Sequence, residues 1–171
     1  MNAKKRSFPY YVLVLLALLA LLAALLLRFA GGALFSRDPA EIVVTAEGQQ
    51  LTWVVAKNQW HGSQYDREPT FVLYQRSGLL PSQVSGGTSV SITMNGTLPD
   101  QVTLGEYALT ANESSVYGQA DLLEEHAFYF DGRTGSFPLP QAADAPVRGY
   151  LLTCSWGGNT CEYAFVVQLL P

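Results

Sequence analysis

The sequence predicts an all-β protein, an antiparallel β-sandwich that follows one transmembrane helix. Two observations lead to this prediction. An uncharged apolar run fills residues 8–27, which is about the length that an α-helix needs to cross a hydrocarbon core. Through residues 41–171, short segments rich in valine, threonine and aromatic residues alternate with turn residues, as in antiparallel sandwiches. A small β-barrel is the alternative fold.

The charges around the apolar run indicate its orientation. Basic residues 4–6 precede the run Phe8–Leu27, and only Arg28 and Arg37 follow it before the first acidic residue. Since basic residues tend to stay on the cytoplasmic side, we expect the N-terminus inside the cell and the C-terminal part outside. The run has no polar face, which a helix packed in a soluble core would show.

The apolar run is longer than the core of a cleaved signal peptide. Arg28 also separates it from the small residues Ala30–Ala33, where a cleavage site would lie. We therefore expect a retained signal-anchor in the cell membrane. The expected organisation is a cytoplasmic N-terminus (residues 1–7), a transmembrane helix (8–27), a linker (28–40) and an extracytoplasmic β-sandwich domain (41–171).

The expected extracytoplasmic domain is acidic. From Asp38 onward the chain has 14 acidic and five basic residues, a net charge of −9. This balance argues against a basic face for nucleic acid. It is compatible with cations or basic partners, and solubility alone explains it equally well.

Eight segments of this domain have the pattern of strands, and turn residues such as E-G-Q, N-G-T-L-P-D and W-G-G-N separate them. Asp121–His126 is the one segment expected to make a helical turn. This regular spacing predicts an immunoglobulin-like sandwich. The expected strands are Glu41–Ala46, Gln50–Lys57, Thr70–Gln75, Thr88–Met94, Gln101–Thr110, Ala127–Phe130, Arg148–Trp156 and Thr160–Leu169.

The M-N-A-K-K-R-S start, the leucine-rich span and this strand spacing together define the architecture of the chain. In architecture it resembles single-pass extracytoplasmic proteins of Gram-positive bacteria that carry an immunoglobulin-like domain. The resemblance implies an anchored surface domain, and no functional residue follows from it.

The two cysteines, Cys154 and Cys161, flank a glycine pair. If Gly157-Gly158 turn a β-hairpin, the cysteines stand directly opposite each other, at a separation that a disulfide accepts. Because thiols oxidise outside the cell, we expect a cross-strand disulfide, with two buried reduced thiols as the alternative. The spacing does not fit a C-x-x-C redox motif or a four-ligand zinc site.

This register places one apolar face and one largely polar face on the hairpin. The polar face has three apolar exceptions, Leu151, Ala164 and Val166. We expect the apolar face to point into the core. It consists of Tyr150, Leu152, Cys154, Trp156, Cys161, Tyr163, Phe165, Val167 and Leu169.

Residues 58–69 contain the richest mixture of aromatic and charged side chains between two expected strands. Loops on rigid scaffolds commonly carry binding residues, so the sequence predicts a recognition loop here. The alternative is an ordered connection whose aromatic residues only cover the edge of the sandwich. The candidate binding residues are Trp60, His61, Tyr65, Asp66, Arg67 and Glu68.

The sequence contains no catalytic signature. His61 beside Asp66 or Glu68 provides the elements of a base and its orienting group, and His126 is the one further histidine for a metal site. A nucleophile motif is absent, and Asp131-Gly132 fits a hairpin turn better than a calcium loop. We therefore expect no cofactor and no metal.

The expected function is a non-catalytic binding or accessory role toward a protein partner at the membrane. Two alternatives remain open. One is an extracytoplasmic hydrolase or metal-dependent enzyme that uses the 58–69 loop. The other is a structural subunit or spacer of a membrane assembly.

Overall fold

The computed structural model describes Val12 and residues 14–22, 39–60, 63–66, 69–111, 117–141 and 146–170. The chain forms two compact units, Met1–Arg37 and Asp38–Pro171. In the first unit, residues 14–22 are helical and exposed. No helix among the described residues has both the length and the apolar character that crossing a bilayer requires. The predicted segment Phe8–Leu27 extends to both sides of this helix, into residues outside the described ones.

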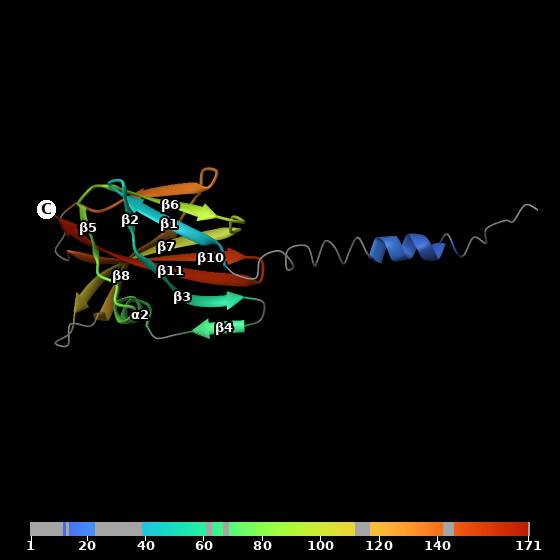
Figure 1. Ribbon diagram of the computed structural model, residues 1–171, viewed down its shortest axis with the longest axis horizontal. Helices are drawn as coiled ribbons and strands as arrows, with labels where there is room; N and C mark the ends of the chain where they lie inside the picture. Colours follow the sequence, from blue (N-terminus) through green and yellow to red (C-terminus); the bar gives the residue numbers. More distant parts are fainter. Residues whose placement is uncertain are drawn as a thin grey trace, which may run out of the picture. The chain divides into compact units, whose positions relative to one another are not determined.

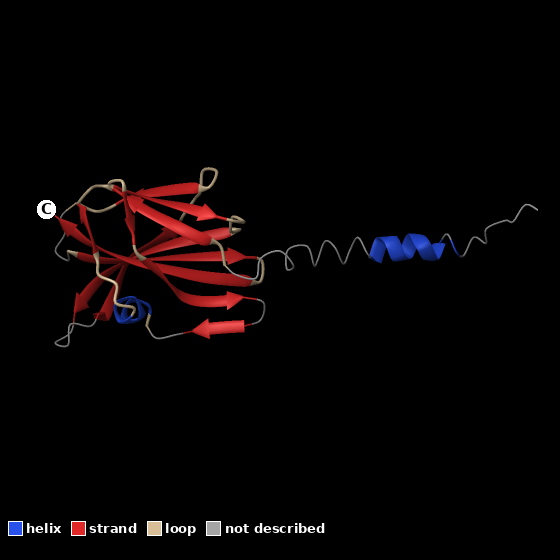
Figure 2. Ribbon diagram, in the orientation of Figure 1, coloured by secondary structure: helices blue, strands red, loops and turns tan. Residues whose placement is uncertain are grey.

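The second unit is built almost entirely of strands (Figures 1 and 2). One sheet has four antiparallel strands in the order β2-β1-β6-β9. Its strands are β1 (Glu41–Ala46), β2 (Gln49–Leu51), β6 (Ser89–Asn95) and β9 (Thr134–Pro138).

The other sheet has seven strands, six of them in the antiparallel order β4-β3-β11-β10-β7-β8. The seventh, β5, pairs in parallel with the end of β11. Neither sheet closes on itself, so the alternative of a β-barrel is wrong. The strands are β3 (Trp53–Trp60), β4 (Ser63–Asp66), β5 (Ser82–Ser85), β7 (Gln101–Ala111), β8 (Tyr117–Ala127), β10 (Val147–Trp156) and β11 (Asn159–Leu170).

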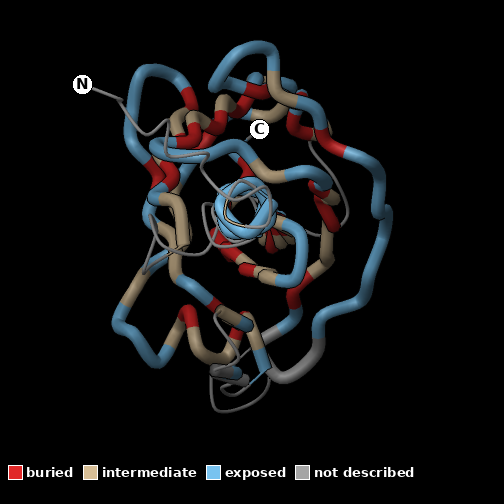
Figure 3. The backbone as a smooth tube through the Cα atoms, turned by 90° about the vertical axis from the view of Figure 1, so that its right-hand side faces the viewer, coloured by how far each residue is buried: buried red, intermediate tan, exposed pale blue. Residues whose placement is uncertain are grey.

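The main core lies between the two sheets, which makes the unit a β-sandwich. Alternate residues of β1 and β6, such as Val44 and Ile92, are fully buried against Leu152 and Phe165 of the larger sheet. Figure 3 shows the same alternation along the tube, where buried and exposed residues succeed one another. The predicted all-β sandwich of two antiparallel sheets is therefore confirmed.

The closing hairpin forms in the predicted register. Gly157 and Gly158 make the turn, with φ of 57° at Gly157, and Cys154 pairs directly with Cys161. The predicted core face is confirmed as well, since all of its members are buried except Trp156, which packs partly buried against the same cluster.

One predicted strand is a helix. Thr70–Gln75 belongs to α2 (Thr70–Arg76), although its valine and aromatic residues suggested a strand. Pro69 precedes the helix and donates no amide hydrogen bond, and Phe71 and Tyr74 lie three residues apart, so both face the sheet. Tertiary packing of this apolar stripe outweighs the strand preference of the individual residues.

Helix α2 covers the outer face of the seven-stranded sheet. Phe71 and Tyr74 form a second core cluster with Ala164 and Val166, and Leu151 packs against it. The apolar exceptions on the outer face of the hairpin are therefore the surface that α2 covers. Tyr74 is locked in place because its hydroxyl donates to the Leu80 carbonyl at 3.0 Å and lies 2.7 Å from Thr52 Oγ1.

Other segments differ from their predictions in strand boundaries or in secondary-structure type. The expected strand Gln50–Lys57 divides at Thr52 between β2 and β3, which belong to different sheets. Asp121–His126 is part of β8 and makes no helical turn. Strand β8 lies at an edge of the sheet, and its described side chains, 120–127, are all exposed. The segment therefore has no alternation of buried and exposed residues that would predict a strand. Of the expected strand Ala127–Phe130, only Ala127 belongs to a strand, the end of β8. The rest of β8 and strands β4, β5 and β9 were not predicted.

Candidate functional site

The structure does not contain the predicted disulfide, because Cys154 and Cys161 are both free and buried. The Ser155 carbonyl accepts the Asp100 amide at 2.7 Å, so Ser155 turns its backbone away from β11. The adjacent pair Cys154–Cys161 is therefore a hydrogen-bonded pair, in which facing side chains lie farther apart than in the alternative pair type.

Burial makes these thiols unreactive. It raises the pKa of Cys154 to about 12, with a further contribution from neighbouring Cys161, and it raises the pKa of Cys161 to about 11. A reactive cysteine needs a lowered pKa and solvent access, and neither thiol has them. The cysteines are therefore part of the core.

The predicted recognition loop 58–69 is largely a hairpin. Its first residues continue β3, and Ser63–Asp66 form β4, in which Tyr65 pairs with Asn58 and Asp66 with Lys57. Trp60 is half-buried with its ring edge-on to Trp156, at a centroid distance of 5.2 Å. His61, Arg67 and Glu68 lie outside the described residues.

Two of the residues proposed for an enzymatic or metal site, Asp66 and His126, lie within the described part of the chain, and these two do not converge. Asp66 lies on β4 and His126 on β8, the two opposite edges of the seven-stranded sheet, with four strands between them. Five strand spacings of about 4.8 Å separate such edges. Within the part of the chain that the structure describes, no three His, Cys, Asp or Glu side chains are grouped as metal ligands.

A different set of polar residues gathers in a cavity of about 270 Å³ between the two sheets. Strands β7, β8 and β10 supply its polar residues, and β9 of the smaller sheet closes it with Phe137 and Pro138. The register explains this gathering, because Glu106 lies directly opposite Tyr150 on one side and Glu124 on the other. The cavity is lined by Leu104, Glu106, Glu124, His126, Phe137, Pro138 and Tyr150.

A buried ion pair between Arg148 and Glu106 lies beside the floor of the cavity. Arg148 Nη1 lies 3.4 Å from Glu106 Oε1, and the two side chains are only 9% and 19% exposed. Arg148 is the one buried charged residue among those the structure describes. Burial raises the pKa of Glu106; Arg148 opposes this effect, whereas the like charge of Glu124 adds to it. Removing a charge pair from water costs free energy. A buried ion pair is therefore unusual in a sheet that has only a structural role.

The Tyr150 hydroxyl is a polar group that lies buried without a partner. Its residue is 1% exposed, and its oxygen lies near the Glu106 carboxylate without a hydrogen bond of regular geometry to any described residue. Burial raises its pKa, and the nearby Glu106 carboxylate raises it further. Leaving such a group unsatisfied costs about 1–3 kcal/mol, so it points to a ligand or solvent partner in the cavity.

Glu124 and His126 form the outer rim of the cavity. They alternate on β8, with His126 Nδ1 3.9 Å from Glu124 Oε1, and their side chains are 44% (His126) and 71% (Glu124) exposed. Glu124 stands opposite Glu106 on the same face, an arrangement of like charges that destabilises a sheet on its own. A few polar groups that converge in a cavity with apolar walls are characteristic of ligand sites.

The sequence carries one signal for this site, a charged residue on an otherwise apolar face of a strand. Arg148 has the same parity as Tyr150, Leu152 and Cys154 on β10, so it is a charge on the core-facing side of a strand. Its acidic partner on β7 follows only from the pairing of two strands about 40 residues apart along the chain.

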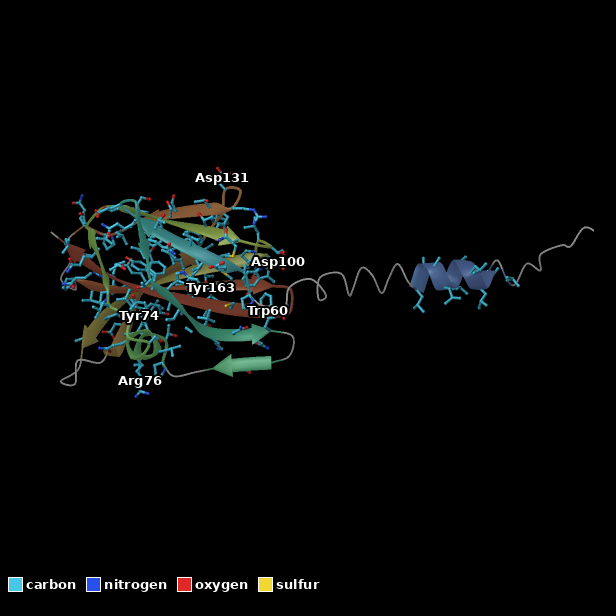
Figure 4. The ribbon with its side chains drawn as sticks, in the orientation of Figure 1. Trp60, Tyr74, Arg76, Asp100, Asp131 and Tyr163 are labelled. Atoms are coloured by element: carbon cyan, nitrogen blue, oxygen red, sulfur yellow. The ribbon has the colours of Figure 1, made fainter. Side chains whose placement is uncertain are left out.

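A second depression, of about 390 Å³, lies beside the closing hairpin, between residues 98–103 and 127–130. Tyr129 is 80% exposed at its rim, and Asp100 accepts a hydrogen bond of 2.7 Å from the Gly157 amide. Figure 4 shows Asp100 and Trp60 at the same end of the domain. This depression contains no buried polar group without a partner among the described residues, so the inter-sheet cavity is the stronger candidate.

No protein-family model matches the chain, and no curated protein matches it. Two solved structures are similar to part of it. One is an engineered protein, with a TM-score of 0.40 and 15% identity over 78% of this chain and 21% of that one. The other is a chitin binding domain from Burkholderia pseudomallei, with a TM-score of 0.37 and 9% identity over 57% of this chain and 60% of that one. The chain spans about a fifth and three fifths of their lengths, and such scores do not establish a shared fold.

Proposed function

We propose that this chain is a membrane-anchored extracytoplasmic binding protein that recognises its ligand without catalysis, through the inter-sheet cavity. The anchor is the apolar run Phe8–Leu27, and the acidic β-sandwich is the part that meets the ligand. A partner protein in or near the membrane either supplies that ligand or interacts with the domain once the ligand is bound.

The observation that carries the proposal is the unpartnered Tyr150 hydroxyl. It lies at the floor of a cavity beside a buried ion pair, and the polar side chains of Glu124 and His126 form the rim. Ligand sites combine apolar walls with a few convergent polar groups, and Phe137 and Leu104 provide such walls here. No nucleophile with an activating base is grouped in this cavity, which favours binding over chemistry.

We also propose that the sandwich is immunoglobulin-like. Two face-to-face sheets, a core of alternating inward residues and a closing hairpin in the centre of the larger sheet support this assignment. The four-plus-seven division of strands differs from the seven or nine strands of immunoglobulin domains.

The segment 58–69 is a second candidate surface. Its position at an edge of the larger sheet supports recognition, whereas the contact of Trp60 with Trp156 supports a structural role. The two roles separate in a partner capture from membranes with Trp60→Ala and Tyr65→Ala. Loss of the captured partner supports recognition, and an unchanged set of partners contradicts it.

A thermal-stability screen of the full chain in detergent tests the proposed function. The panel contains small amines, carboxylic acids, sugars and short peptides. We expect at least one class to raise the melting temperature of the wild type, because a ligand that binds only the folded state stabilises it.

The matched variant is Tyr150→Phe, which removes the hydroxyl and keeps the ring. The ligand should stabilise this variant less than the wild type. If no class stabilises the wild type, or if every stabilising ligand acts equally on Tyr150→Phe, the proposed site is wrong.

A further inference from the structure

We propose that the inter-sheet cavity binds the primary ammonium group of an organic cation, either a free aliphatic amine or a lysine side chain. This inference rests on the proposed function and names the chemical class of the ligand. Glu106, Glu124 and Tyr150 are the three groups that receive the ammonium.

The charges of the cavity call for one more cation. Glu106 and Glu124 stand directly opposite each other on the same face of the sheet. Arg148 pairs with Glu106, and the imidazole of His126 lies 3.9 Å from Glu124 at the rim, so the space between the two carboxylates holds no cation. Arg148 lies on the Glu106 side, since it approaches Glu106 Oε1 to 3.4 Å, while the Glu124 carboxylate is 71% exposed. A cation between the two carboxylates removes the repulsion of this pair.

The unpartnered hydroxyl adds a second and independent argument. Tyr150 lies opposite Glu106 in the register, so the polar groups Tyr150, Glu106 and Glu124 form one row across three adjacent strands. An ammonium has three N–H donors and no acceptor. Each of the two carboxylates and the phenolic oxygen can accept one of these N–H groups.

The walls and the size of the cavity favour an organic cation over a metal ion. Leu104, Phe137 and Pro138 are apolar, and a cavity of about 270 Å³ accommodates a short aliphatic chain behind the ammonium. The aromatic ring of Phe137 also favours a nearby cation. In contrast, no three His, Cys, Asp or Glu side chains of the described residues, those of this cavity included, are placed to hold a metal ion.

Ligand-observed NMR titration of the full chain in detergent, at low salt, tests this assignment. The probes are n-butylammonium and the blocked lysine N-acetyl-lysine-methylamide, with n-butanol and butyrate as neutral and anionic controls. We expect both cationic probes to bind and both controls to fail. Tighter binding of the blocked lysine assigns the ammonium to a partner protein, and equal or weaker binding assigns it to a free amine.

Two adjacent glutamates provide a matched pair of variants. Glu124→Gln removes a carboxylate from the cavity, whereas Glu125→Gln removes one from the opposite face of β8, where Glu125 pairs with Gly105. Since both residues are exposed, both variants should fold. We expect Glu124→Gln to weaken butylammonium binding about tenfold and Tyr150→Phe about fivefold, from the loss of one charge-assisted and one weaker hydrogen bond. Glu125→Gln should bind like the wild type.

The inference is overturned if neither cation binds, or if Glu124→Gln and Glu125→Gln bind equally. A ligand of another class that needs Tyr150 overturns the ammonium assignment and leaves the proposed binding function intact. If no probe of any class depends on Tyr150, both proposals fail together.

Discussion

At the scale of single residues, the domain depends on a few polar atoms buried inside an apolar sandwich. Arg148 and Glu106 neutralise each other within the core side of the larger sheet. The Arg148 Nε and the Tyr150 hydroxyl remain without partners in the described structure. Because unsatisfied buried groups are costly, these two atoms mark the place where the fold gives up stability in favour of the cavity.

Replacing Arg148 should destabilise the domain more than replacing both members of its ion pair. Arg148→Ala leaves the Glu106 carboxylate buried without a counter-charge, and such a loss costs about 3 kcal/mol or more. The double variant Arg148→Met/Glu106→Gln contains no unpaired charge and should recover most of this loss. Urea unfolding followed by tryptophan fluorescence measures both, and equal costs for the single and double variants would contradict an energetic role of the pair.

The two cysteines should resist alkylation in the folded protein. Their pKa values, raised to about 12 and about 11, leave very little thiolate at pH 8. An unfolded cysteine has a pKa of about 8.5, so we expect iodoacetamide to react more than about 100-fold faster after unfolding in urea. Mass spectrometry should find two modified thiols per chain without any reducing agent. If the unfolded chain takes up no label until it is reduced, the cysteines are oxidised.

At the scale of elements, helix α2 fixes the outer face of the larger sheet. Phe71 rests on Gly149 of β10 and packs on the ring of Tyr107 at a centroid distance of 5.2 Å. Tyr74 anchors the same helix from within the domain, while Arg76 points outward at its end (Figure 4). A helix of seven residues is marginal in isolation, so its stability comes from this packing.

Adding a methyl group at Gly149 should loosen α2. A Cβ atom there would lie 2.4 Å from the ring of Phe71, so Gly149→Ala should destabilise the domain by about 1–3 kcal/mol. The second substitution Phe71→Leu removes the clashing ring atoms and should restore part of the loss. Denaturant unfolding gives both values.

Gly158 is the matched control for this change. It lies in the hairpin turn with nothing within 4 Å of an added Cβ atom, and its φ is outside the left-handed range. Gly158→Ala should therefore change stability by no more than about 0.5 kcal/mol. If Gly149→Ala changes the free energy of unfolding as little as Gly158→Ala, close packing of Phe71 on Gly149 does not hold α2 in place.

At the scale of the whole molecule, the distribution of charge agrees with a tethered domain that meets cations. Half of the ten basic residues lie within the first 37 residues, and all 14 acidic residues follow them. The net charge of the part from Asp38 onward is −9, which raises the local concentration of cations around the domain. This field and the ammonium site proposed above act in the same direction.

Intact cells should expose this domain to an external protease. The expected signal-anchor Phe8–Leu27 with its basic N-terminus places residues 41–171 outside. A membrane-impermeant protease should then remove the domain from whole cells and leave a cytoplasmic control protein uncut. Full protection of the domain, with digestion only after lysis, would contradict the predicted topology.

The sequence by itself determined the elements whose pattern is local. Strands β1, β6, β7, β10 and β11 follow the alternation of apolar and polar residues to within a residue or two, and the glycine pair fixes the register of the closing hairpin. These features could be predicted because the period of two and the turn chemistry are both contained in neighbouring residues.

Only the tertiary structure determined the secondary structure of the ambiguous segments and the set of residues that meet in the cavity. Thr70–Arg76 is a helix because Phe71 and Tyr74 pack together on the outer face of the larger sheet. Residues 117–127 form strand β8 because they pair with the edge of β7. The two thiols are free and buried, although the hairpin sets them directly opposite each other. The cavity joins Glu106, Glu124 and Tyr150 from three strands, and such a grouping depends on long-range pairing that no local pattern encodes.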